Sequence, residues 1–411
     1  MAFAPRRRAR SIWRFYRAEQ RTLRQGLAAL LLSTGAGLVA GIVLGSISDT
    51  LTLLPSLFIL IPAAVGMKGT IFGAIGARLG TASATGLFEV TRERSGVLYQ
   101  NVYAGTITTF SSCLYLAALA RLSAAVFGLH SISFLDFVTI SVVGGVLGSA
   151  FAMALTIGLS VASFRRGFDL DSVSTPIVTA SGDMVTIPCL FLATFIVRVE
   201  WLNAVVAGIC IVVCLYAIVR GAMTDLKLAR RAILEMTGVI VLTPLLDILA
   251  GTIVEPRIER FAAFPALLVI IPPLVSNAGA LGGILSSRLS SKLHLGLIST
   301  RMWPERLAWA DASLVMASGL VAFTLVGTLG YLYGVVVHRS LGPGVMIGGT
   351  VLTGVITTFI AIFVGYYVAV LATRFGLDPD NQSVPIITSV MDLAGVITFL
   401  LVLSVLGVGI R

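Results

Sequence analysis

The chain has 411 residues, of which 57% are hydrophobic and only 12% are charged, and its mean hydropathy is +0.99. A soluble protein is expected to carry about twice that charged fraction, so a large soluble core is excluded. Apolar runs of about 20 residues recur along nearly the whole chain, as in a helical bundle and unlike the short alternating strands of a β-barrel. The sequence therefore predicts an all-α polytopic membrane protein.

The N-terminal segment 1–24 is the only candidate for a region outside the membrane, and it is rich in arginine. We interpret it as a basic amphipathic arm on the cytoplasmic leaflet, where anionic lipid attracts arginine and Trp13, Phe15 and Tyr16 enter the interface. A simpler role for these charges is to hold the N-terminus inside the cell. A nucleic-acid-binding arm is less favoured, so no nucleic-acid partner is expected.

Eleven membrane spans are predicted from the apolar runs. They cover residues 25–47, 52–88, 102–127, 135–163, 175–198, 202–220, 231–252, 262–287, 307–337, 343–373 and 384–409. The second span is too long for one straight crossing, which predicts a bend or a steep tilt. Arginine and lysine are much more frequent in connections on the N-terminal side of the membrane. This bias predicts a plasma-membrane protein with its N-terminus cytoplasmic and its C-terminus outside.

The chain repeats itself. Residues 55–86 match residues 265–296 without gaps, at an offset of 210, and residues 169–185 match residues 378–394 at an offset of 209. Each repeat has five spans, so a linking helix at 201–222 is needed to give the second copy the orientation of the first. We therefore expect two parallel repeats, 25–200 and 223–411, related by a pseudo-two-fold axis along the membrane normal. This 5+1+5 arrangement resembles a homodimer fused into one chain, and we expect it to function as a pseudo-dimeric monomer around a central ion pore.

The fifth span of each repeat carries an aspartate at an equivalent position, Asp183 and Asp392. A charged Asp near the bilayer centre costs about 2.5–3.5 kcal/mol on insertion scales, so such residues usually face a bundle interior or an aqueous path. If these spans line the axis, the two carboxylates face each other. A structural Asp that only bonds a neighbouring helix is the alternative. It is weaker for a symmetric pair than for one isolated residue.

Oxygen-bearing residues surround both aspartates. Pro176 and Pro385 interrupt or start the helices and free backbone carbonyls nearby. The neighbouring hydroxyl groups belong to Thr179, Ser181, Thr186, Thr388 and Ser389. Such an all-oxygen site disfavours zinc and copper and suits Mg²⁺, which would keep several waters and meet the carboxylates through them. We therefore predict a metal site at Asp183 and Asp392 with Thr179 and Thr388.

Other acidic and polar residues have two alternative roles each. Four further aspartates precede the fifth spans and form either a vestibule or regulatory Mg²⁺ site, or only helix caps: Asp169, Asp171, Asp378 and Asp380. Asp247 in the seventh span has no acidic twin, because Ala40 aligns with it when the basic starts of the two repeats are matched. Asp247 and Asn277 are candidate pore-lining residues. Helix–helix hydrogen bonding is the commoner role for such groups.

Two segments carry a family resemblance. The stretch "PAAVGMKGT", followed by "GARLGTA", and the stretch "DPDNQSVPIITSVMD" resemble the second- and fifth-helix signatures of MgtE-type magnesium transporters. The chain looks closer still to solute carrier family 41 and its prokaryotic relatives, over nearly everything after the basic arm. The resemblance implies a Mg²⁺ channel or transporter whose pore is lined by Asp183 and Asp392. Thr70 stands where the family usually has Asn, and the CBS sensor domains of long bacterial members are missing.

The sequence motifs bear on three classes of function. A Mg²⁺ permeation protein, either a channel or an exchanger coupled to Na⁺ or H⁺, fits the paired aspartates best. A proton- or sodium-coupled transporter of an organic substrate is the alternative, but it predicts an aromatic or basic pocket that these motifs do not supply. An enzyme is not expected, because the three histidines lie near span ends and form no nucleophile–base constellation.

Overall fold

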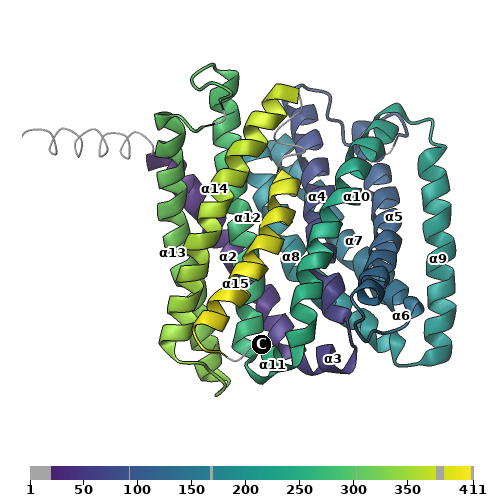
Figure 1. The fold of residues 1–411 in the computed structure, drawn as a ribbon. Helices are drawn as coiled ribbons and strands as arrows, with labels where there is room; N and C mark the ends of the chain where they lie inside the picture. Colours follow the sequence, from purple (N-terminus) through teal and green to yellow (C-terminus); the bar gives the residue numbers. More distant parts are fainter. Residues whose placement is uncertain (1–19, 92, 167–169, 302, 376–383, 409–411) are drawn as a thin grey trace, which may run out of the picture.

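A computed structural model describes residues 20–91, 93–166, 170–301, 303–375 and 384–408 (Figure 1). The first half contains α2 (Gln20–Ser46), α3 (Ser48–Leu53), α4 (Leu57–Ala84), α5 (Val97–Val126), α6 (Phe134–Thr139), the π-helical turn η1 (Ile140–Gly144), α7 (Gly145–Arg166) and α8 (Leu170–Val197). The linking helix α9 (Glu200–Ala222) follows.

The second half repeats this order. It contains α10 (Lys227–Val254), the 3₁₀ turn η2 (Glu255–Arg257), α11 (Ile258–Ala263), α12 (Pro265–His294), α13 (Arg306–Val336), the π-helical turn η3 (Gly344–Gly348), α14 (Gly349–Phe375) and α15 (Val384–Val405). Within the described residues, ten helical segments are long and apolar enough to cross a membrane, and α2 adds a shorter apolar stretch, Leu30–Ser46. The predicted all-α bundle of about eleven long apolar helices is confirmed. The N-terminal arm lies outside the described residues up to residue 19.

The predicted second span, 52–88, is two helices and not one bent crossing. The chain leaves α3 at Leu53 and starts α4 at Leu57, and Ser56 between them has a positive φ of 68°. A carboxylate oxygen of Glu255 accepts a hydrogen bond from the Ser56 backbone N–H, which satisfies one of the donors left free at the start of α4. The excess length that suggested a bend or tilt therefore lies outside α4, in the end of α3 and the turn at residues 52–56 and in residues 85–88.

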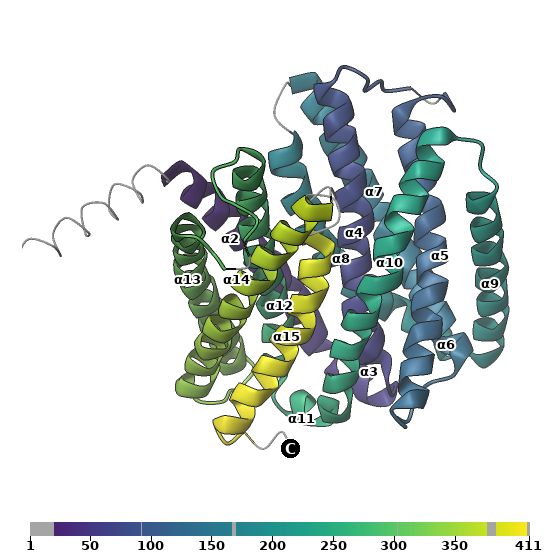
Figure 2. The same cartoon turned by 45° about the horizontal axis from the view of Figure 1, so that its top comes forward.

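The two halves exchange their first helices. α2 packs most extensively on α12, and α10 packs most extensively on α4, although each pair joins different repeats. Figure 1 shows α2 beside α12 and α13, and α10 beside α4 and α5, while each also packs on the fifth helix of its own half, α2 on α8 and α10 on α15. Figure 2 shows the same two groups of helices from a tilted direction, with α9 at the outer edge beside α5.

Two equivalent glycines allow these close crossings. A Cβ atom on Gly251 of α10 would lie 2.8 Å from the Ile59 backbone of α4, and a Cβ on Gly41 of α2 would collide with the Val269 backbone of α12. In both partners the residue numbers differ by 210, so the two crossings are equivalent contacts repeated in the two halves. Glycine is required there because nothing larger fits between two helix backbones in direct contact.

Candidate cation site

Asp183 lies in the middle of α8, where its side chain is 7% exposed. Its Oδ2 accepts a hydrogen bond from Ser276 Oγ of α12 at 3.2 Å, and Ser276 Oγ lies 2.8 Å from Ser33 Oγ of α2. The single hydroxyl proton of Ser276 is directed to Asp183, so Ser33 is the donor in the second bond. Asp183 is thus held by Ser276 of the second half, which is itself bonded to Ser33 of the first half, and the sequence alone did not single out this serine pair.

Asp392 lies eight residues after the start of α15, about 12 Å along the helix, and it is also 7% exposed. α8 and α15 are not packed extensively against each other. The Asp392 carboxyl nevertheless lies close enough to Asp183 and Asp247 for the charge of each to act on it. Asp183 and Asp247 therefore both lie within electrostatic reach of Asp392, without direct contact among the three carboxyl groups.

Asp247 is completely buried on α10, one of the exchanged helices. Its Oδ2 lies 2.8 Å from the position that a Cβ on Gly66 of α4 would occupy. Within the described part of the chain neither carboxylate oxygen makes a hydrogen bond of normal geometry, although the Ser389 hydroxyl of α15 approaches. A buried carboxyl group without hydrogen-bond donors lowers stability, so an aspartate at this position is a candidate for a functional role.

The helix crossings correct the register used for Asp247. The equivalent contacts of Gly41 and Gly251 align α2 with α10 at an offset of 210. In this alignment the residue equivalent to Asp247 is Gly37 and not Ala40. The expectation that Asp247 lacks an acidic twin holds in either register. The cluster of three carboxyl groups is therefore asymmetric, with two groups from the second half and one from the first.

Several predicted site residues have other partners. Asn277 is fully buried, and its Nδ2 donates to Thr34 Oγ1 of α2 at 2.8 Å, which joins the exchanged helix to α12. Thr388 Oγ1 donates to the Val384 carbonyl at 3.0 Å in the first turn of α15, where Pro385 is half-buried. Thr186 bonds within α8 and to α4. Ser181 is half-buried on α8.

The remaining candidates cannot be placed at the site. Asp169, Asp378 and Asp380 lie outside the described residues. Pro176, Thr179 and Asp171 belong to α8, but their side chains lie outside the described part of the structure. Among the described residues, no three His, Cys, Asp or Glu side chains are grouped closely enough to hold a metal ion directly.

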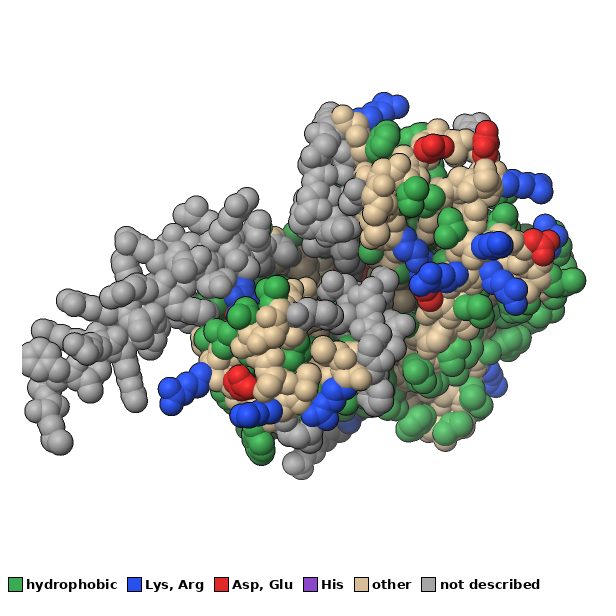
Figure 3. Space-filling model, turned by 90° about the horizontal axis from the view of Figure 1, so that it is seen from above, with side chains coloured by type: hydrophobic (Ala, Val, Ile, Leu, Met, Phe, Trp, Pro, Cys, Tyr) green, Lys and Arg blue, Asp and Glu red, His purple; other side chains and the backbone are tan. Residues whose placement is uncertain are grey.

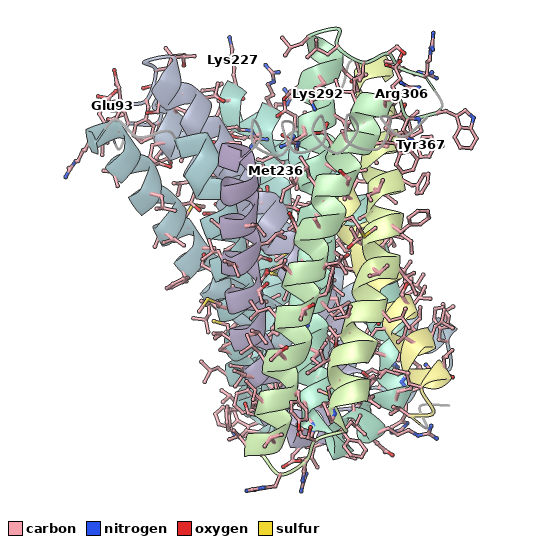
Figure 4. All side chains as sticks on the ribbon, turned by 90° about the vertical axis from the view of Figure 1, so that its left-hand side faces the viewer. Glu93, Lys227, Met236, Lys292, Arg306 and Tyr367 are labelled. Carbon is pink, nitrogen blue, oxygen red and sulfur yellow. The ribbon has the colours of Figure 1, made fainter. Side chains whose placement is uncertain are left out.

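Basic residues gather at one end of the bundle. Lys227, Lys292 and Arg306 mark this end in Figure 4, and Figure 3 shows lysine and arginine spread over the same face. Two ion-pair clusters lie just below it. Arg288 and Lys292 of α12 contact the fully buried Asp311 of α13 at 2.6 and 2.5 Å. These salt bridges join the C-terminal end of α12 to the N-terminal end of α13.

The corresponding cluster in the first repeat is built differently. Arg78, which is equivalent to Arg288, contacts Glu235 of the exchanged helix α10 at 3.1 Å, and Glu235 also pairs with Arg231 at 2.8 Å.

In the connection before α13, in the second repeat, the Ser299 hydroxyl donates to Glu305 and lowers the pKa of that exposed carboxyl. The basic end is thus tied together mainly by pairs that neutralise its acidic residues.

Comparison with known proteins places both halves in one family. The family model described as "MgtE: Divalent cation transporter" matches residues 61–193 and 271–402. Solute carrier family 41 member 2 of Xenopus laevis is 25% identical over 92% of this chain and 71% of its own length. Solute carrier family 41 member 3 of Rattus norvegicus is 23% identical over 90% of this chain and 84% of its own length. No solved structure shows a significant match to the chain.

Proposed function

We propose, from the premise that this chain belongs to the MgtE family of divalent cation transporters, that it carries Mg²⁺ across the membrane between Asp183 and Asp392. The chain is an integral membrane protein with about ten spans, and it is a transporter and not an enzyme. The observation that carries the proposal is the burial of Asp183, Asp247 and Asp392 inside the bundle, on helices from both halves, with the first two within electrostatic reach of Asp392.

The chemistry of these groups favours a hard divalent cation. Carboxylate and hydroxyl oxygens are the ligands that Mg²⁺ prefers, and the ion gives up its waters reluctantly. A hydrated Mg²⁺ would meet Asp183 and Asp392 through its waters, and their two negative charges would balance its own. Asp247 would add a third acidic group on the side of α15. Thr179, Thr388 and the aspartates that precede α8 and α15 are proposed as oxygen donors along the path.

The orientation follows from charge. The basic end in Figure 4 is proposed to face the cytoplasm, because positively charged connections are retained there. The arginine-rich arm would then meet anionic lipid on the inner leaflet of the plasma membrane. The aspartates at 169, 171, 378 and 380 would line the cytoplasmic mouth of the path.

The direct test is Mg²⁺ flux into proteoliposomes that contain the purified full chain. We expect Asp183→Asn and Asp392→Asn each to lower the flux at least about tenfold, which corresponds to roughly 1.4 kcal/mol of lost stabilisation. Asp49→Asn is the matched control, because Asp49 is an exposed aspartate of α3 outside the cluster. Melting curves in detergent would establish that all three variants fold.

Imposed gradients separate the possible mechanisms. Flux that follows the membrane potential alone indicates a channel, whereas flux that requires a Na⁺ or proton gradient indicates an exchanger. Full Mg²⁺ uptake by the double variant of Asp183 and Asp392 would remove the paired-carboxylate proposal. Absence of Mg²⁺ flux in the wild-type protein would favour the alternative of a coupled transporter for another substrate.

A further inference from the structure

Among the described residues, Lys68 is the only lysine that is almost completely buried, with an exposed fraction of 1%. It lies on α4, and its Nζ donates to Thr186 Oγ1 of α8 at 3.0 Å. Thr186 Oγ1 in turn donates to the Gly182 carbonyl at 2.5 Å. Gly182 and Thr186 share one face of α8 and flank Asp183, which projects from the neighbouring face toward α12. The lysine therefore holds the turn of α8 that carries Asp183.

Small residues make room for this lysine. A Cβ on Gly148 of α7 would collide with the Lys68 amine, and a Cβ on Gly182 would lie 3.7 Å from the Lys68 Cβ. The thiols of Cys113 and Cys189 lie close enough to interact electrostatically with the amine. α4, α7 and α8 pack against one another around this point, as Figure 1 shows.

The second repeat fills the same place with apolar side chains. The residues equivalent to Lys68, Cys113 and Gly182 are Ala278, Phe323 and Met391, which are all buried. The alignment is supported by the contacts of two equivalent glycines, since Gly145 faces Cys113 and Gly354 faces Phe323. Lysine with small neighbours has thus been exchanged for alanine with large neighbours.

This exchange shows that the fold does not require a lysine at this place. An ammonium group in the membrane interior costs about 2.5–3.5 kcal/mol on insertion scales, and well-packed apolar groups usually serve stability as well or better. A single hydroxyl partner offsets little of that cost. A reason beyond packing is needed for its retention beside Asp183.

We propose that Lys68 is a positioning residue for cation transport, which acts through Thr186 to hold the α8 turn so that Asp183 points toward the path. The inference rests on the proposed function, because it assigns Lys68 to the same site. Asp392 has no such support, since the positions equivalent to Gly182 and Thr186 are Met391 and Gly395. The two aspartates are therefore unequal, because this lysine–threonine link is found only beside Asp183.

The test combines flux kinetics with melting in the purified full chain. We expect Lys68→Met to raise the KM for Mg²⁺ at least fivefold while the Mg²⁺-free protein melts at the wild-type temperature or above. Thr186→Val should have the same effect, and the double variant should be no worse than either single variant, because both remove one link. A merely structural lysine would instead lower the melting temperature and leave KM unchanged, which would overturn the proposal.

A glycine pair supplies an independent perturbation. Gly148→Ala places a methyl group against the flexible end of Lys68 and should displace the amine from Thr186, so its KM should rise as in Lys68→Met. Gly158→Ala is the matched control on the same helix, because nothing lies within 4 Å of the added methyl group. Equal KM values in the two alanine variants would also count against the proposal. Failure of the proposed function would show separately, as absence of Mg²⁺ flux in the wild type.

Discussion

The exchanged helices can be tested by adding one methyl group at their crossing. In Gly251→Ala the new Cβ would lie 2.8 Å from both Cα and O of Ile59 and 3.0 Å from the Phe58 carbonyl oxygen. Carbon atoms in favourable contact lie about 3.5–4.0 Å apart, so the overlap is close to 1 Å. All three neighbours are backbone atoms, and no change of rotamer can relieve the overlap. α10 must move away from α4.

The expected cost follows from two opposing terms. Overpacking in a well-packed interior typically destabilises by about 1–3 kcal/mol. Alanine in place of glycine in a helix interior stabilises by roughly 0.5–1 kcal/mol, and Gly238→Ala, with open space around it on the same helix, isolates that gain. Both variants share that gain, so they should differ only by the overpacking cost, roughly 1–3 kcal/mol in the free energy of unfolding.

Thermal melting of the purified protein in detergent measures this difference. Gly238→Ala should melt at or above the wild-type temperature, and Gly251→Ala clearly below it. Gly41→Ala, at the equivalent crossing of α2 and α12, should resemble Gly251→Ala. If Gly251→Ala melted together with Gly238→Ala, the direct backbone contact between the two halves would be refuted.

Three further outcomes are expected. Asp311→Asn should lower stability by about 3–5 kcal/mol, since it removes the buried carboxylate that the half-buried Arg288 and Lys292 both contact, whereas Arg231→Gln removes an exposed pair and should cost no more than about 1 kcal/mol; melting curves of the two variants compare them. Asp247→Asn should lower Mg²⁺ flux yet leave the melting temperature of the Mg²⁺-free protein unchanged or raised, because a buried carboxyl without donors is costly; a lowered melting temperature would contradict this. Chelation of Mg²⁺ should lower the melting temperature of the wild type but not that of the Asp183→Asn/Asp392→Asn variant; equal shifts would place the stabilising ion elsewhere.

The sequence was sufficient to predict the helical bundle, because apolar runs and their repetition are properties of single segments. It was also sufficient to pair Asp183 with Asp392 by their equivalent positions. The choice of packing partners was not accessible in the same way. Nothing in the periodicity of α2 indicates that it packs on α12 of the other half, because that contact depends on glycine at one crossing point, and glycine is abundant throughout the chain.

The surroundings of the site were also beyond a reading of single segments. Ser276 and Ser33 are ordinary helix residues until the exchange of helices brings them together beside Asp183. The alignment that makes Gly37 equivalent to Asp247 depends on backbone contacts between helices. Matching the basic starts of the two repeats instead gives Ala40. Lys68 was visible as a charged residue inside a span, but only the neighbours on three helices show how it is accommodated.

Joining the two halves in one chain has a consequence for how such a protein can evolve. In a true homodimer every substitution is made twice, so a lysine beside one aspartate would appear beside both, and a third carboxyl group would arrive with a fourth. A single gene removes that constraint, and Lys68 and Asp247 each occur in one half alone. The two sides of the path can then specialise independently. The packing of α2 on α12 and of α10 on α4 keeps each half dependent on the other.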